Sequence, residues 1–393
     1  VATLARLTDL LGARLLPVIP SEGSVGASGD LTPLSYVASM LLGEGEVYGP
    51  TGREPAAAAL ARVGLAPLSL EPKESLALMN GTSAMTGLAA LGWVRAARFA
   101  RIACAGTAWM VEVLHGRAEH FDARLAAAKA HPGQVQAAEL IRADLAVGPH
   151  PPRGGARVQD RYSLRCAPQV IGVLLDALRL FAPVLEAELN GVSDNPLVDI
   201  DGDAILHGGN FYGGHVTFVL DGLKAAVASV AELLERQLVQ LLHSATSQGL
   251  PDNLVAVEGA ERAAHHGFKA MEITASALVA EALKLTMPAG AFSRSTEGHN
   301  QDKVPMGPIA ARELLRVLDL AETVSAIHLL ACAQAADLRG AASLRGRAAE
   351  LYANIRRQVP PVTRDRRQDG DIQWMLAAIR GDGLGLPDDG GQP

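Results

Sequence analysis

The stretch GHVTFVLDGLKAAVASVAELLERQLVQLLHSATSQGLP, Gly214–Pro251, contains one of the strongest periodic patterns of this 393-residue sequence. Its apolar residues recur at steps of three and four from Val216 to Leu242, and charged residues fill the gaps. Such spacing gathers the apolar side chains on one side of an α-helix. The pattern predicts a helix that starts at Gly214 and ends near Gly249-Leu250-Pro251, where glycine and proline stop it.

Other parts of the sequence carry the same helical pattern. Long helices are expected over Glu258–Leu285 and Pro308–Leu338, and one or two more over Thr82–Leu114. Strand-like alternation is scarce, and Asn195–Leu206 is the best candidate for a small hairpin. Helices of this length exceed the globular mean of about 11–12 residues. The sequence therefore predicts a mainly α protein, an elongated bundle of long helices that associate side by side through apolar stripes.

Composition excludes several classes of function. The net charge of −7 and the aromatic content of 4% argue against a nucleic-acid partner. The three cysteines, Cys104, Cys166 and Cys332, are far apart and suggest neither a disulfide framework nor a zinc site, so we expect a cytoplasmic protein. No apolar run reaches about 18 residues, which predicts no membrane-spanning helix. We expect no metal, no nucleic acid and no membrane among its partners.

Five polar clusters interrupt the helical pattern. Taken singly, each has an ordinary interpretation as a turn or a helix cap. In one of them Gln159, Tyr162 and Arg165 are spaced by three, and on a helix this spacing would place all three on one face, able to meet one ligand. The clusters, in order, are GSVGASGDLTPL from Gly23, LMNGTSAM around Asn80, VQDRYSLRCAPQ from Val158, NGVSDNP with HGGNFYGG from Asn190 to Gly214, and SRSTEGHNQDKVPMG from Ser293.

In this order the clusters resemble the motifs of the aromatic amino acid ammonia-lyases and aminomutases, the family of the histidine, phenylalanine and tyrosine ammonia-lyases. The resemblance covers nearly all of residues 1–340. It implies the ammonia-lyase (fumarase/aspartase-like) helical architecture and a homotetramer whose active sites are shared between subunits. We expect a helical lyase core over 1–355 and a C-terminal helix with a flexible tail over 356–393.

The resemblance also implies an internal electrophile, 4-methylidene-imidazole-5-one, formed autocatalytically from Ala27-Ser28-Gly29. The amide nitrogen of Gly29 attacks the carbonyl of Ala27, and two waters leave, one of them with the hydroxyl of Ser28. Glycine suits this step because it lets the backbone fold tightly onto itself, and serine because its β-hydroxyl can be eliminated. The electrophile is part of the chain, so neither a metal nor a diffusible cofactor is implied.

The family's functional residues transfer to matching positions. Ala27, Ser28, Gly29 and Tyr162 are the expected catalytic residues, with Tyr162 a candidate for proton handling. Arg165 matches the arginine that grips the substrate carboxylate, a role that suits a planar guanidinium. The other expected substrate-binding residues are Asn80, Gln159, Asn210, Phe211, Asn300 and Gln301, supported from behind by Asp30, Asp194 and Asn195.

One residue of the sequence bears on the identity of the substrate. Histidine ammonia-lyases typically carry a glutamate where this chain has Gln301, so the neutral amide favours tyrosine or phenylalanine. The implied reaction removes ammonia from an aromatic L-amino acid and leaves an arylacrylate. The alternatives are a 2,3-aminomutase that gives a β-amino acid, a histidine ammonia-lyase, and a non-catalytic truncated paralogue. Pro305 departs from the family's usual serine.

The family's essential tyrosine lies on a loop well upstream of Ala-Ser-Gly. Only 26 residues precede Ala27 here, and none matches that loop. The sequence is therefore interpreted as lacking the N-terminal region of the family. Without its positioned base the chain should lose at least ~10²–10⁴ in rate unless that segment is supplied.

Overall fold

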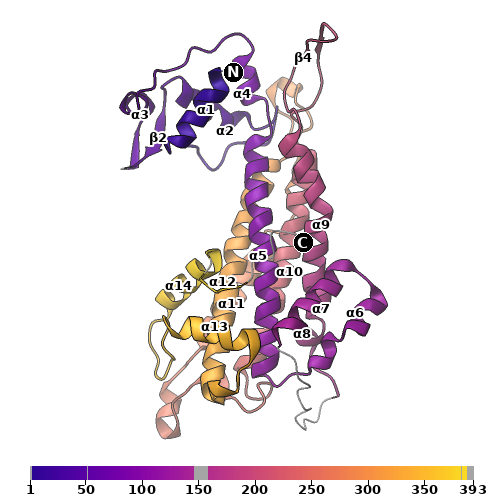
Figure 1. Ribbon diagram of the computed structural model, residues 1–393, viewed down its shortest axis with the longest axis vertical. Helices are drawn as coiled ribbons and strands as arrows, with labels where there is room; N and C mark the ends of the chain where they lie inside the picture. Colours follow the sequence, from indigo (N-terminus) through magenta and orange to yellow (C-terminus); the bar gives the residue numbers. More distant parts are fainter. Residues whose placement is uncertain (1, 51, 146–157, 382, 387–393) are drawn as a thin grey trace. The chain divides into compact units, whose positions relative to one another are not determined.

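The computed structural model describes residues 2–50, 52–145, 158–381 and 383–386 (Figure 1). Its longest helices within these residues are α5 (Ser83–Val113), α9 (Ala167–Asn190), α10 (Gly214–Leu242) and α12 (Gly307–Arg339). The predicted mainly α fold is confirmed, and the helices predicted over Thr82–Leu114 and Pro308–Leu338 match α5 and α12 within one residue. None of the described helices combines the length and apolar character needed to cross a membrane.

The chain divides into two compact units. The first comprises Val1–Ala90, Pro183–Asp221 and Pro288–Glu313, and the remaining residues form the second. Four of the five boundaries fall within α5, α9, α10 and α12, and the fifth lies between Met287 and Pro288, outside these helices.

The first unit combines short helices with a small sheet. Leu10, Leu15, Leu41, Val47 and Leu60 form its apolar core, and each of these residues is almost fully buried. The sequence did not predict the sheet, in which β1, β2 and β3 pair antiparallel in that order. The elements of this part are α1 (Ala2–Gly12), β1 (Leu16–Pro17), α2 (Leu31–Leu41), β2 (Glu46–Gly49), β3 (Gly52–Pro55), α3 (Ala56–Arg62) and α4 (Glu74–Met79).

A separate hairpin in the first unit was predicted. Strand β4 (Leu197–Asp199) pairs antiparallel with β5 (Ala204–Leu206), inside the range expected from the sequence. The turn between them is closed by Asp199, whose Oδ1 accepts a hydrogen bond from the amide of Gly202 at 3.0 Å. Aspartate at this place in a turn mimics a backbone acceptor, which explains why so short a hairpin is readable from sequence.

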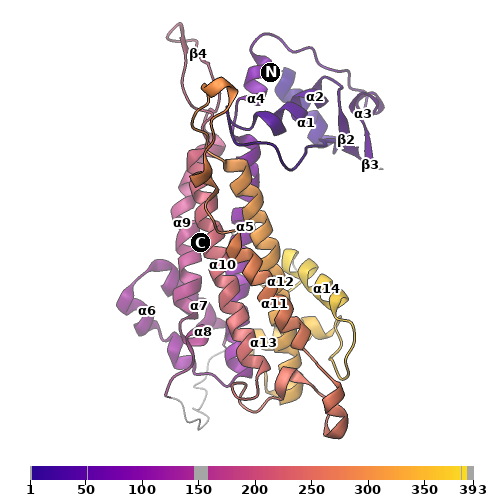
Figure 2. The same cartoon turned by 180° about the vertical axis from the view of Figure 1, so that it is seen from behind.

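The second unit is a helical bundle in which α5, α9, α10 and α12 run side by side in both views (Figures 1 and 2). Trp93 of α5 donates from Nε1 to the carbonyl of Leu178 in α9 at 3.1 Å. Gly106 of α5 lies against the ring of His328 in α12, so that a side chain there would crowd the imidazole. Around the bundle lie α6 (Ala123–Lys129), α7 (Pro132–Asp144), α8 (Tyr162–Arg165), α11 (Lys269–Lys284), α13 (Gly346–Arg356) and α14 (Asp369–Arg380). The C-terminal helix expected after residue 355 corresponds to α14, and residues 387–393 of the expected flexible tail lie outside the described residues.

Two predicted helix ends were wrong. Helix α10 ends at Leu242 rather than near Gly249, because the carbonyl of His243 accepts the amides of Thr246 and Ser247, which form a tight turn instead of continuing the helix. The helix predicted to start at Glu258 starts only at Lys269. Gly267 precedes it with φ +54°, and a Cβ there would overlap the Asn253 carbonyl oxygen, so the chain turns sharply before α11 begins.

Candidate active site

A tight turn at residues 26–30 forms the centre of the site. Ser28 has φ +51° and Gly29 has φ +76°, both in the left-handed region, and the amide of Gly29 donates to the carbonyl of Gly26 at 3.2 Å. Helix α2 begins immediately afterwards, at Leu31. A non-glycine residue held at positive φ is strained, and such strain concentrates at functional sites.

Gly29 occupies a place that only glycine can fill. A Cβ on Gly29 would overlap the carbonyl oxygen of Gly81 and lie 2.8 Å from its carbonyl carbon. Next to it, the amide of Asp30 donates to the same Gly81 carbonyl at 2.7 Å. Gly81 lies between α4 and α5, so the Ala27-Ser28-Gly29 turn is pressed backbone to backbone against the loop that follows Asn80.

The carboxyl group of Asp30 is buried beneath the turn at the start of α5. Its Oδ2 accepts the amide of Met85 at 2.8 Å, an arrangement that the positive end of the helix dipole favours. Burial nevertheless raises the pKa of Asp30 to about 6, against the opposing effect of the Met85 and Ala84 amides, while the charge of Glu188 adds to the rise. Asp30 therefore changes its charge near pH 6, within the pH range in which proteins are usually studied.

Gln301 reaches the hydroxyl group that the turn presents. Its Nε2 donates to Ser28 Oγ at 2.8 Å, and its Oε1 accepts from Thr296 Oγ1 at 3.0 Å. An isolated antiparallel bridge between Thr296 and Gln301 holds the backbone of this loop. The Gln301 amide is thus fixed at both ends, with its donor directed at Ser28.

Asn80 and Asn195 are joined on the other side of the turn. Asn80 Nδ2 donates to the carbonyl of Asn195 at 3.3 Å, and Asn195 Oδ1 accepts the amide of Gly208 at 2.8 Å. Asp194 accepts the amide of Asn195 at 2.7 Å and is gripped by Lys73, whose Nζ lies 2.8 and 2.6 Å from its two carboxylate oxygens. Sequence reasoning missed Lys73, because a lone lysine seven residues before Asn80 gives no sign of its partner 121 residues further on.

Ser28, Asn80, Asn195 and Gln301 line a cavity of about 320 Å³ in the first unit, large enough for a small molecule. Of the predicted residues, Gly29 and Asp30 lie beside this lining, whereas Asn210 points its amide at the carbonyl of Val192 at 3.4 Å. Sequence reasoning missed Tyr212, Asp302 and Lys303, which also line it. The predicted residues that line the cavity are Ala27, Ser28, Asn80, Asn195, Phe211, Asn300 and Gln301.

Gln159, Tyr162 and Arg165 belong to the second unit and are not among the residues that line this cavity. Helix α8 begins only at Tyr162, so the expectation that all three share one helix face was wrong, and Gln159 lies in the bend before the helix. Arg165 places its guanidinium 4.4 Å from the centre of the Tyr162 ring, a cation–π contact, and its Nε donates to the carbonyl of Asp160 at 3.0 Å. The Tyr162 side chain is mostly exposed.

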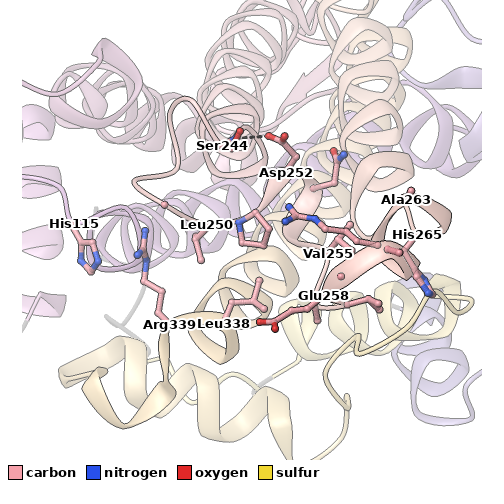
Figure 3. Close-up of a pocket in the computed structure, with 18 residues that line it drawn as sticks. His115, Ser244, Leu250, Asp252, Val255, Glu258, Ala263, His265, Leu338 and Arg339 are labelled. Carbon is pink, nitrogen blue, oxygen red and sulfur yellow. Dashed lines mark hydrogen bonds between the residues drawn. The ribbon is translucent and has the colours of Figure 1, made fainter.

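A second cavity, of about 1320 Å³, lies in the second unit (Figure 3). It opens among residues that follow α10 and near the end of α12, with Ser244 hydrogen-bonded to Asp252 on its wall. Arg339 on this wall donates to the backbone carbonyls of Val113 and Ser247, each at 2.6 Å, so it serves to tie loops together. No predicted site residue lies here, and the cavity beside Ser28 is therefore the candidate active site. Within the described residues, no group of three or more His, Cys, Asp and Glu side chains could hold a metal ion.

Comparison with known proteins agrees with this geometry. Residues 1–357 match the family described as aromatic amino acid lyase. The chain is 40% identical to a histidine ammonia-lyase of Geobacillus kaustophilus over 377 residues, covering 96% of this chain and 74% of that protein. It is 41% identical to a tyrosine ammonia-lyase of Cereibacter sphaeroides over 401 residues, covering 96% of this chain and 75% of that protein. A solved tyrosine aminomutase of Streptomyces globisporus superposes with a TM-score of 0.90 at 37% identity, over 98% of this chain and 76% of that one. The chain therefore belongs to the aromatic amino acid lyase family, a family of carbon–nitrogen lyases.

Proposed function

We propose that this chain eliminates ammonia from an aromatic L-amino acid, tyrosine or phenylalanine in preference to histidine, and releases an arylacrylate. The observation that carries the proposal is the Ala27-Ser28-Gly29 turn, wound at positive φ against Gly81 and contacted by Gln301, at the wall of a small cavity. Phe211 gives this cavity an aromatic wall that suits an aromatic side chain.

The residues of the turn fit the 4-methylidene-imidazole-5-one group. Gly29 has no side chain to block its approach to Gly81, and the turn already brings its amide back toward the preceding residues. Gln301 donates to the oxygen of Ser28, the atom that must leave as water, and a donor at this oxygen stabilises its departure. Once formed, the group supplies an electrophile that makes the substrate's amine or β-proton easier to remove.

The roles of three further residues are inferred from their match to motif positions of the family. We propose that Arg165 binds the substrate carboxylate, that Tyr162 handles a proton and that Gln159 packs beside them. The cation–π contact holds Tyr162 and Arg165 as a pair, which supports a joint role. We further propose a homotetramer in which this pair serves the cavity of a neighbouring subunit, with Asn80, Asn300 and Gln301 on the cavity's own side.

The choice of substrate follows from charge. Gln301 is neutral, and a neutral amide offers no special attraction to a substrate whose side chain can carry a positive charge. Tyrosine or phenylalanine is therefore favoured. The histidine ammonia-lyases and the aminomutase among the relatives support two alternatives, histidine as substrate and a 2,3-shift of the amino group.

The test has two steps. The intact mass of the purified chain should fall short of the sequence mass by two waters, and the full sequence mass would overturn the proposed electrophile. The chain is then incubated separately with L-tyrosine, L-phenylalanine and L-histidine, at a protein concentration high enough to detect a rate about 10²–10⁴-fold below that of an ordinary enzyme, because no residue here matches the family's upstream tyrosine. Coumarate or cinnamate with free ammonia would support the proposal, whereas urocanate would identify histidine as substrate and a β-amino acid would identify an aminomutase.

A further inference from the structure

A buried amide in the core of the second unit holds the segment that carries Tyr162 and Arg165. Gln237 of α10 is completely buried. Its Nε2 donates to the carbonyl of Ser163 at 2.8 Å and to Thr107 Oγ1 at 3.0 Å. On its other side, Oε1 lies 2.9 Å from Nε2 of His328. A polar side chain in a helical core is costly unless every polar atom has a partner, and here each has one.

The chemistry of these partners fixes which way the Gln237 amide points. The Ser163 carbonyl can only accept a hydrogen bond, so it must face the amide's NH₂ group. The amide oxygen then faces His328, whose Nε2 must carry a hydrogen. Burial lowers the pKa of His328 to about 3, which keeps the ring neutral, and its Nδ1 lies 3.9 Å from the Cys332 sulfur. His328 therefore acts as a fixed donor that holds Gln237 in place.

A second glutamine grips the same residue. Gln240, one helical turn after Gln237 on the side of α10 that faces α8, donates from Nε2 to Ser163 Oγ. Both oxygen atoms of Ser163 are thus bound by amides of α10. Ser163 lies between Tyr162 and Arg165 in α8, which is only four residues long. Only Cys166 separates α8 from α9, so α9 anchors the C-terminal end of this single turn, and the two amides of α10 anchor its middle.

We propose that Gln237 and Gln240 are positioning residues of the lyase. By binding Ser163, they hold α8 in the one conformation that stacks Arg165 on Tyr162, and so set the direction in which this pair is presented. The functional part of this inference rests on the proposed roles of Tyr162 and Arg165. The structural part, that the two amides hold α8, stands independently of those roles.

Hydrogen exchange tests the structural part. The amides of Arg165 and Cys166 donate within α8 to the carbonyls of Arg161 and Tyr162, at 3.0 and 2.8 Å, and their exchange rates report the opening of this turn. In Gln237→Met the side chain keeps its length but loses its donors. We expect exchange of these two amides to accelerate at least about tenfold. Exchange at the wild-type rate would overturn the inference.

Gln334 provides a matched control. It is equally buried, on α12, and binds the backbone of Val362 through both ends of its amide, each at 2.9 Å. Gln334→Met should therefore lower the melting temperature as Gln237→Met does, yet leave exchange in α8 at the wild-type rate. Equal acceleration in both variants would show a general loss of stability and overturn a specific role for Gln237.

A milder variant covers the case in which Gln237→Met does not fold. Ser163→Ala removes only the hydroxyl that Gln240 binds and leaves the backbone carbonyl to Gln237. It should accelerate exchange of the Arg165 and Cys166 amides about threefold to tenfold, and an unchanged rate would overturn the role of Gln240.

Kinetics tests the functional part. With a substrate that the wild-type chain converts, Gln237→Met should raise KM about tenfold, because Arg165 is no longer held for the carboxylate, while the two-water mass deficit stays complete. Faster exchange with an unchanged KM and kcat would overturn the functional part alone. A wild-type chain that converts none of the three amino acids would count against the proposed function and leave the exchange result to decide the structural part.

Discussion

Gln301 donates a hydrogen bond to the hydroxyl group of Ser28 at 2.8 Å, so the loop after η5 (Glu297–His299) is bound to the turn that contains Ala-Ser-Gly. The contact joins a neutral donor to the oxygen that would leave in the proposed dehydration of the turn. We propose that this contact gives Gln301 a role in forming the electrophile, in addition to the substrate contact expected from its position.

Replacing Gln301 should therefore slow maturation. In Gln301→Met the donor is lost, and the fraction of protein that has lost two waters should fall severalfold when measured by intact mass at a fixed time after induction. Asn300→Ala is the control. Asn300 lines the same cavity but pairs with Glu297 at 3.0 Å, so its loss should leave the mass deficit complete. Full maturation in Gln301→Met would assign Gln301 to substrate binding alone.

Gly29→Ala should abolish maturation and strongly destabilise the first unit, because the new methyl group would overlap the backbone of Gly81. Gly64→Ala is the control that separates the cost of backbone strain at positive φ from the cost of steric overlap with Gly81. Gly64 has a nearly identical φ of +74°, but a Cβ there meets nothing within 4 Å. We expect Gly64→Ala to cost only about 1 kcal/mol in the free energy of unfolding and Gly29→Ala at least about 3 kcal/mol, measured by urea denaturation. Equal losses in the two variants would show that backbone strain alone accounts for the effect.

Asp30 should make stability depend on pH in the direction opposite to that of most carboxyl groups. Its pKa is about 6 in the folded chain against an ordinary 3.8, so the folded state binds the proton more tightly than the unfolded state does. The stabilisation is present below about pH 4, is lost as the pH rises toward 6, and amounts to about 3 kcal/mol. The free energy of unfolding of Asp30→Asn, relative to that of the wild type, should rise progressively between pH 4 and pH 6.5. A stability difference that stays constant over this range would contradict the assignment.

The ion pair between Lys73 and Asp194 should matter for activity through Asn195. Lys73→Met leaves Asp194 without its partner and loosens the backbone that presents Asn195 to the cavity. We expect kcat/KM to fall at least about tenfold, measured with the preferred amino acid. Arg62→Met removes a more exposed ion pair, that with Glu54, and should leave kcat/KM unchanged. Unchanged kinetics in Lys73→Met would reduce this pair to a purely structural contact.

The sequence predicted the elements whose pattern is long. Helices α5 and α12 each exceed thirty residues, so their apolar periodicity repeats often enough to be unambiguous. The sheet of the first unit was not predicted, because β1 has only two residues and β2 and β3 have four each. A strand of that length shows no alternation to read, and its pairing depends on the core that Val47 enters.

The residues of the site also fall into those that the sequence predicted and those that it did not. Ser28, Asn80, Phe211 and Gln301 lie within recognisable motifs, and the structure brings them to one cavity. Lys73 lies outside those motifs and Gln237 lies on an ordinary helical stretch, and their roles depend on partners distant in sequence. A sequence motif also does not show in which direction a side chain points. Asn210 was expected in the pocket and turns to a backbone carbonyl, whereas Asn195, expected behind it, lines the cavity.

The partners that meet at Ser28 are separated by 273 residues of chain. At a synthesis rate of about 5–20 residues per second, Ser28 is added to the growing chain roughly 14–55 seconds before Gln301 is. During this interval the hydroxyl has no donor from the loop around Thr296. If dehydration depends on Gln301 as proposed, it cannot begin until residue 301 has joined the chain, and Ser28 stays an ordinary serine until then.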